Sequence, residues 1–136
     1  MGGNIKTFAV VGSRKFPEEM YPKVFELLDR FYNKYNPKIF CSGGAKGVDC
    51  AAEGWAKTKD MSRLIYRPSL YDNKPGSPLK RNTDIVEASD FILAFSFQNS
   101  RGTQDSIEKA LQKKKAIIVF DENLKVVKSA NIPVDS

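Results

Sequence analysis

The chain has 136 residues, of which 41% are hydrophobic and 28% are charged, a composition typical of one globular domain with a single core. It contains no histidine, which excludes Ser-His-Asp triads, Cys-His pairs, HExxH zinc sites and a histidine general base. The net charge of +6 makes nucleic acid a candidate partner.

Apolar runs alternate with helical patterns along the chain. In chain order, these patterns predict a strand at 6–11, a helix at 22–35, a strand at 38–41, a helix at 48–57, a strand at 62–67, a helix at 79–88, a strand at 91–95, a helix at 103–113 and a strand at 116–120. The proline-containing, polar residues 69–78 predict a loop. Residues 121–136 have no strong period, and both a final short strand and a loose tail remain open.

Strands that alternate with helices favour right-handed βαβ units and a parallel sheet covered on both faces. We therefore predict an α/β fold in which residues 1–136 form a single Rossmann-like, doubly wound domain. Its mostly parallel sheet should contain about five strands in the order 3-2-1-4-5. The core should lie at residues 6–120, followed by a C-terminal tail at 121–136.

Three of the predicted strands are followed by loops of small residues, at 12–14, 42–47 and 99–103. In doubly wound sheets, ligands bind outside the carboxyl ends of the strands. Glycine lets the backbone approach an anion, the amides of the next helix point toward it, and serine and arginine add hydrogen-bond donors. We therefore predict a phosphate-bearing ligand, bound by Gly12, Ser13, Arg14, Ser42, Gly43, Gly44, Ala45, Gly47, Ser100, Arg101, Gly102 and Thr103.

Other site types are disfavoured by the motifs that the chain lacks. Neither GxxxxGK[ST] nor GxGxxG occurs in these loops, which argues against a P-loop NTPase and an ordinary NAD-dependent dehydrogenase. Cys41 and Cys50 suit a reduced protein, and we expect both in the core, with no metal and no cofactor. Without a signal-peptide pattern or a long apolar run, we expect a soluble, cytoplasmic protein with no membrane partner.

Four segments of the chain resemble the SLOG superfamily, in particular its small YspA/YpsA-related Rossmann-like members, which are often found in bacteria and phages. The matching segments are VVGSRKF (10–16), CSGGAKGVDCAAEGWA (41–56), KRNTDIVEASD (80–90) and SRGTQDSIEKA (100–110). The resemblance covers about residues 6–120 and implies that Arg81 and Asn82 also contact the ligand.

Two relatives within this superfamily imply different functions. The LOG-type phosphoribohydrolases cleave the N-glycosidic bond of nucleoside 5'-monophosphates and carry a PGGxGTxxE motif. When Gly102 and Thr103 are aligned with its GT pair, Ser106 occupies the position of the acid. This departure puts hydrolysis in doubt, because the oxocarbenium-like transition state needs a nearby carboxylate. Asp49 and Asp105 are the provisional catalytic acids.

The other relative is the DprA/Smf Rossmann domain, which binds single-stranded DNA. The chain is similar to it in the Gly-Ser-Arg turn at 12–14, in the SGxAxGxD segment and in the Arg-Asn pair at 81–82. Single-stranded nucleic-acid binding is therefore the alternative function. Its stacking aromatic side chains would have to be Phe16, Tyr71 or Phe97.

The leading interpretation is the binding of a nucleotide or nucleotide-derived small molecule. Its phosphate would meet the helix N-termini, and its base would lie toward the loop at 69–78. Whether Asp49 caps its helix or contacts a ribose or water is open, whereas we expect Trp55 in the core. The positive charge at the site should come from Arg14, Lys46, Arg81 and Arg101, and a helix face formed by Phe25, Leu28, Phe31 and Tyr32 could support a homodimer.

Overall fold

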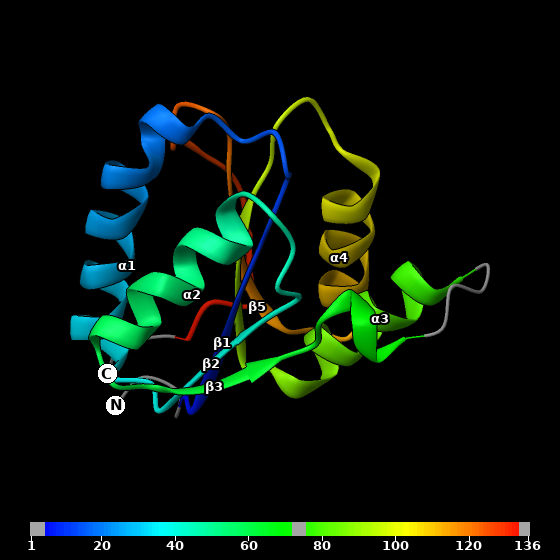
Figure 1. Ribbon diagram of the computed structural model, residues 1–136, viewed down its shortest axis with the longest axis horizontal. Helices are drawn as coiled ribbons and strands as arrows, with labels where there is room; N and C mark the ends of the chain where they lie inside the picture. The colour runs from blue at the N-terminus through cyan, green and yellow to red at the C-terminus, as the bar shows by residue number, and fades with distance from the viewer. Residues whose placement is uncertain (1–4, 72–75, 134–136) are drawn as a thin grey trace.

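The computed structural model describes residues 5–71 and 76–133 (Figure 1). In chain order the elements are β1 (Thr7–Gly12), the 3-10 helix η1 (Glu18–Met20), α1 (Tyr21–Tyr35), β2 (Ile39–Ser42), α2 (Val48–Thr58), β3 (Ser62–Ile65), the 3-10 helix η2 (Pro68–Leu70), α3 (Ser77–Ala88), β4 (Phe91–Phe95), α4 (Arg101–Gln112), β5 (Ala116–Phe120) and β6 (Val126–Ala130). The strands and helices that the sequence predicts are all present.

The strands form one six-stranded sheet in the order β3-β2-β1-β4-β5-β6. β1 to β5 are parallel, whereas β6 pairs antiparallel with β5. The predicted Rossmann-like α/β fold is therefore confirmed, including the order of its first five strands. The segment left open at the C-terminal end contains a strand, β6. Its residues are largely exposed at the sheet edge, which explains why they carry no clear hydrophobic period.

Helices cover both faces of the sheet, α1 and α2 on one side and α3 and α4 on the other (Figure 1). Alternation along β1 supplies both cores, because successive side chains of a strand point to opposite faces. Phe8 packs in the cluster with α1 and α2, whereas Ala9 and Val11 pack in the cluster with α3 and α4. The ring centroid of Phe8 lies 4.9 Å from that of Phe31, which ties α1 to the sheet.

The surface of α2 that faces the sheet is formed by small residues and one large aromatic. Trp55 is 6% exposed, as expected for a core residue, and its Nε1 donates a hydrogen bond to Asp29 Oδ1 at 2.8 Å. Cys41 is buried in β2, but Cys50 is exposed, so the prediction that both cysteines lie in the core is wrong for Cys50. Cys50 is two residues from the buried Val48, which places it on the outer side of the helix.

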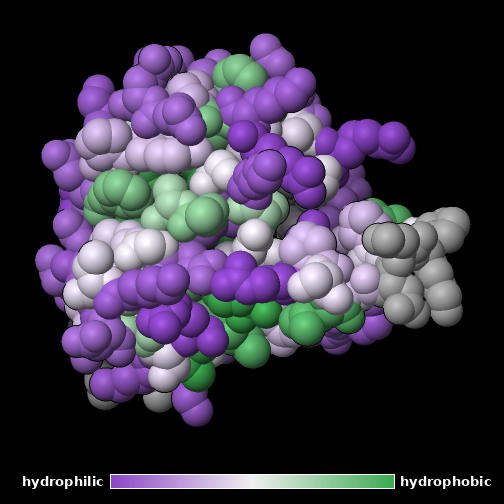
Figure 2. Space-filling view, viewed as in Figure 1, coloured by the Kyte–Doolittle hydropathy of each residue, from purple (hydrophilic) through white to green (hydrophobic). Residues whose placement is uncertain are grey.

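The apolar face of α1 is used within the fold. Leu28 and Phe31 are buried in the core, and Phe25 and Tyr32 pack against the same cluster. Most of this face is therefore used by the core, with Phe25 and Tyr32 only partly buried, and the homodimer stays a prediction. Hydrophilic residues cover most of the face of the molecule seen in Figure 2. None of the helices in residues 5–71 and 76–133 is long and apolar enough to cross a membrane.

Candidate functional site

A cavity of about 530 Å³ lies beyond the carboxyl ends of β1 and β4, bordered by the end of β1 and by the loops that follow β1, β2 and β4. β1 and β4 are neighbours, with β2 and β3 on one side and β5 on the other, so the cavity lies where the strand order reverses. The predicted site residues that line it are Gly12, Ser13, Arg14, Gly43, Ala45, Asp49, Arg81, Asn82, Ser100, Gly102 and Thr103. The structure thus brings the three predicted loops together with the start of α3.

The loop after β1 forms a tight turn that presents Arg14. The backbone N–H of Ser13 donates to the carbonyl of Phe95 at 3.2 Å, which joins this loop to the end of β4. Ser13 Oγ accepts a hydrogen bond from the backbone N–H of Lys15 at 3.2 Å. Ser13 itself is buried, whereas Arg14 is exposed, so its guanidinium is available to an anion.

Several predicted ligand residues build the loops and do not line the cavity. Ser42 is fully buried, and its Oγ accepts a hydrogen bond from the backbone N–H of Gly44 at 3.1 Å, which holds the turn after β2. Gly47 has φ +92°, and a Cβ there would lie 2.9 Å from the carbonyl oxygen of Arg14. Ser42, Gly44 and Gly47 therefore shape the site through the backbone.

The N-terminus of α4 is a second part of the cavity wall. No side chain caps this helix, and its first turn contains no acidic residue. Ser100 Oγ donates a hydrogen bond to Thr103 Oγ1 at 2.9 Å, so both hydroxyls lie together at the helix start. The first amides of a helix have no intrahelical partner and carry partial positive charge. This end of the cavity therefore suits an anion.

Asp49 occupies the first turn of α2 and is 6% exposed. Its Oδ1 is buried and has no hydrogen-bond partner in the part of the chain that the structure describes. Burial raises the pKa of Asp49 to about 7, although the amide of Ala45, the guanidinium of Arg81 and the amides of Gly43 and Gly12 act in the opposite direction. The α2 N-terminus thus faces a carboxyl group of its own helix, which makes it unsuitable for phosphate.

Basic side chains balance this acid within the cavity wall. Arg14, Lys15 and Arg81 line the cavity, and Arg81 Nη1 donates to the carbonyl of Gly43 at 3.1 Å. Lys46 and Arg101 are exposed and do not line it. The cavity therefore carries more positive than negative charge, but from a different set of cations than the sequence indicated.

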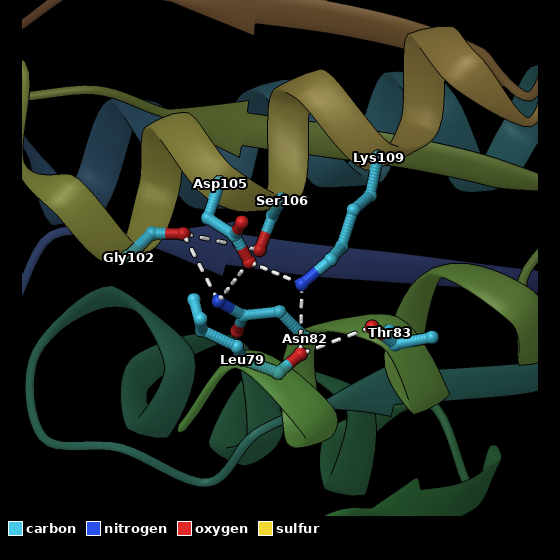
Figure 3. Close-up of polar contacts among 7 residues, drawn as sticks. All are labelled: Leu79, Asn82, Thr83, Gly102, Asp105, Ser106 and Lys109. Carbon is cyan, nitrogen blue, oxygen red and sulfur yellow. Dashed lines mark hydrogen bonds and ion pairs between the residues drawn. The ribbon is translucent and has the colours of Figure 1, made fainter. Parts of the chain in front are cut away.

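Asp105 has its partners within the protein (Figure 3). Its Oδ2 accepts hydrogen bonds from Asn82 Nδ2 at 3.0 Å and from Lys109 Nζ at 2.7 Å. Asn82 Nδ2 also lies 3.3 Å from the carbonyl of Gly102, so this network connects α3 to the first turn of α4. Asp105 does not line the cavity, whereas Ser106 does. Of the two provisional acids, only Asp49 lines the cavity.

Other residues also line the cavity: Pro78, from the loop expected to face the base, and Val11, Lys15, Ile85, Gln98 and Ser106, which the sequence did not indicate. Lys15 directly follows the predicted Gly-Ser-Arg turn, which was a usable signal. Pro78 and Ile85 reach the cavity because α3 packs beside α4, a contact that no local pattern reveals. Among the described residues, no group of three or more acidic or cysteine side chains could hold a metal ion.

Comparisons with known proteins bear on the fold. No protein-family model matches the chain, and neither does any curated protein. Among solved structures, DNA processing protein A (DprA) from Streptococcus pneumoniae is similar with a TM-score of 0.71 and 18% sequence identity. The match covers 85% of this chain, which spans only 50% of the DprA chain.

Two further structures give the same result. TM1055 has a TM-score of 0.65 and 18% identity, over 83% of this chain and 72% of its own. DprA from Helicobacter pylori, in a structure described as showing a single-stranded DNA binding mode, has a TM-score of 0.65 and 18% identity. This match covers 93% of the present chain and 68% of the DprA chain. The chain shares their Rossmann-like fold. At this identity the similarity concerns the fold alone.

Proposed function

We propose that the chain is a SLOG-type protein that binds a nucleotide or nucleotide-derived ligand in the cavity at the ends of β1 and β4. The observation that carries this proposal is that the uncapped N-terminus of α4, Arg14 and Arg81 line one cavity together with a buried carboxyl group. A cavity of about 530 Å³ is in the size range of small-molecule sites.

The charges favour one orientation of the ligand. The phosphate would bind at the α4 N-terminus, near Ser13 and Arg14, because Asp49 would repel it from the α2 N-terminus. The base would extend toward Pro78, where the cavity meets the start of α3. The loop expected to face the base, 69–78, lies partly outside the described residues, which end at 71 and resume at 76.

Hydrolysis of an N-glycosidic bond is the reaction that this cavity fits best. Since burial raises the pKa of Asp49 to about 7, a substantial fraction of this acid is protonated at neutral pH. Asp49 could donate its proton to the leaving base as the C–N bond breaks, while water adds to the sugar carbon and returns a proton to the carboxylate. Asp105 is less suited because Asn82 and Lys109 already contact its carboxylate.

A thermal-shift panel of nucleotides, cyclic dinucleotides and ADP-ribose derivatives tests binding, since a ligand that binds only the folded state raises the melting temperature. We expect at least one phosphate-bearing member to stabilise the protein, and chromatography of the same mixtures to show whether base is released. If no member stabilises the fold, the proposal is wrong. Base release that persists undiminished in Asp49→Asn would remove Asp49 from the reaction.

Single-stranded nucleic-acid binding is the second candidate, supported by the fold shared with DprA and by the net charge of +6. The aromatic side chains argue against it. Phe16 is 2% exposed and packs against Phe95, so it cannot stack on a base. Phe97 packs partly buried against the core, which limits the ring area left for a base, whereas Tyr71 is half-buried with its hydroxyl bound to Asp84 Oδ2 at 2.6 Å.

A salt titration separates the two candidates. Binding of a nucleic-acid strand through several phosphates makes the logarithm of affinity fall steeply with the logarithm of salt concentration. For a mononucleotide we expect only a shallow dependence, because one phosphate is neutralised. Oligo(dT) that binds more tightly than any mononucleotide at 50 mM salt, with a slope corresponding to roughly three or more phosphates, would favour the second candidate.

A further inference from the structure

We propose that Asp49 is a specificity residue that accepts hydrogen bonds from the sugar hydroxyls of the ligand, so that the cavity prefers ribose over 2-deoxyribose. This inference rests on the proposed function, because it assumes that the ligand carries a phosphate. It concerns the part of the cavity near Asp49, away from the α4 N-terminus where we place the phosphate.

The first step is the state of the carboxyl group. Asp49 lines the cavity, yet it is 6% exposed and its Oδ1 has no hydrogen-bond partner among the described residues. Buried polar atoms in folded proteins are nearly always hydrogen-bonded, and an exception calls for a missing partner. The nearest charged group of opposite sign, Arg81, donates Nη1 to the carbonyl of Gly43. Oδ1 is fully buried and the backbone amides of Gly12, Gly43 and Ala45 act on the carboxyl group, so a ligand would reach it through Oδ2, the oxygen beside Gly43.

The second step is the space beside the carboxyl group. A Cβ on Gly43 would lie 3.3 Å from Asp49 Oδ2 and equally close to Arg81 Nη1 and to Ile85 Cδ1. Glycine at this position thus leaves open the volume next to the carboxylate, where any side chain would intrude. The side-chain atoms that border this space are Asp49 Oδ2, Arg81 Nη1 and Ile85 Cδ1, and none of them is a hydroxyl.

The third step is the chemistry of the donor. A carboxylate repels phosphate but accepts hydrogen bonds from hydroxyl groups, and in nucleotide-binding α/β folds an acidic residue commonly binds the ribose. With the phosphate at the α4 N-terminus, the sugar is the part of the ligand that comes next along the cavity toward Asp49. The hydroxyls of ribose are therefore the donors that this arrangement selects, ahead of an amino group on the base.

The test uses ligands without a base. Ribose 5-phosphate, 2-deoxyribose 5-phosphate and inorganic phosphate are titrated into the protein by calorimetry at pH 8, where Asp49 is largely ionised. For the wild type we expect ribose 5-phosphate to bind about tenfold more tightly than its deoxy analogue, since a hydrogen bond to a charged acceptor is lost. In Asp49→Asn this ratio should fall to within about twofold, while inorganic phosphate binds as well as before or better.

The outcomes separate this inference from the proposed function. Equal affinities of the two sugar phosphates for the wild type overturn the role of Asp49, and this comparison needs no variant to fold. A ratio that survives in Asp49→Asn overturns it as well, and a purely structural role of Asp49 would weaken both sugar phosphates equally. Saturable binding of phosphate with no sugar preference would leave the phosphate site standing alone. Absence of binding by all three ligands would count against both.

Discussion

Asp49 is a residue whose burial affects the stability of the fold. Its carboxyl is buried in the cavity wall, and one of its oxygens has no partner in the described protein. A carboxyl held in this way favours the protonated form, which is why its pKa rises from 3.8 to about 7. The same group that suits a sugar hydroxyl or a leaving base therefore makes stability depend on pH.

This dependence predicts a difference between the wild type and Asp49→Asn. Below pH 4 both the folded and the unfolded chain keep the proton, so Asp49 causes no loss. Between pH 4 and pH 7 the unfolded chain releases the proton that the folded chain retains, so the free energy of unfolding falls as pH rises. The total loss is on the order of 4 kcal/mol.

Urea denaturation at a series of pH values measures this effect. The free energy of unfolding of Asp49→Asn, relative to that of the wild type, should increase by up to about 3 kcal/mol between pH 5 and pH 8. All other titrating groups are common to both proteins, and their contributions cancel in the difference. Two profiles that stay parallel over this range would contradict the raised pKa.

At the scale of elements, the site depends on loops that approach each other closely. Gly47 ends the loop after β2 at φ +92°, and a Cβ there would come within 2.9 Å of the carbonyl oxygen of Arg14. There is likewise no room for a side chain at Gly12, since an added Cβ would lie 2.8 Å from Val48 Cγ1. The turn that presents Arg14 is thus packed directly against the start of α2.

Alanine substitutions at two glycines should have opposite effects. Gly47→Ala should lower the free energy of unfolding by about 1–3 kcal/mol, because the residue must adopt a strained backbone conformation against Arg14. Gly54→Ala is the matched control, since nothing lies within 4 Å of its Cβ in the middle of α2. It should stabilise the protein by about 0.5–1 kcal/mol. Urea denaturation of both variants measures the two changes in the free energy of unfolding. Equal effects of the two substitutions would contradict the close approach of Gly47 to Arg14.

The elements also show what the sequence could predict. β4 and β5 were predicted with their observed bounds because each is a continuous apolar run closed by polar residues. The three loops were placed correctly because parallel strands put their carboxyl ends on one edge. Which loop residues line the cavity and which only shape the loop was not predictable, since Ser42 and Gly47 are the same small residue types as those that line the cavity. Asp105 and Asp49 could be told apart only by the partners that folding gives them.

At the scale of the whole molecule, the sheet brings distant segments of the chain to one cavity with basic side chains in its wall. β1 pairs with β4 over five residues, and this pairing sets the Arg14 turn beside the loop that leads into α4. The chain has a net charge of +6, and among the cations at 5–71 and 76–133 only Arg14, Lys15 and Arg81 line the cavity. Affinity for a phosphate-bearing ligand should therefore depend on these few side chains and little on the other cations.

Calorimetric titration of the four ribonucleoside 5'-monophosphates into the wild type, Arg14→Ala and Arg63→Ala tests this claim most directly. Arg63 lies on β3 outside the cavity and controls for the loss of one positive charge. At least one nucleotide should bind with a stoichiometry of one molecule per chain. Its affinity should be roughly tenfold lower in Arg14→Ala and unchanged in Arg63→Ala. If no nucleotide binds saturably, or if the two variants lose affinity equally, the cavity is not a nucleotide phosphate site.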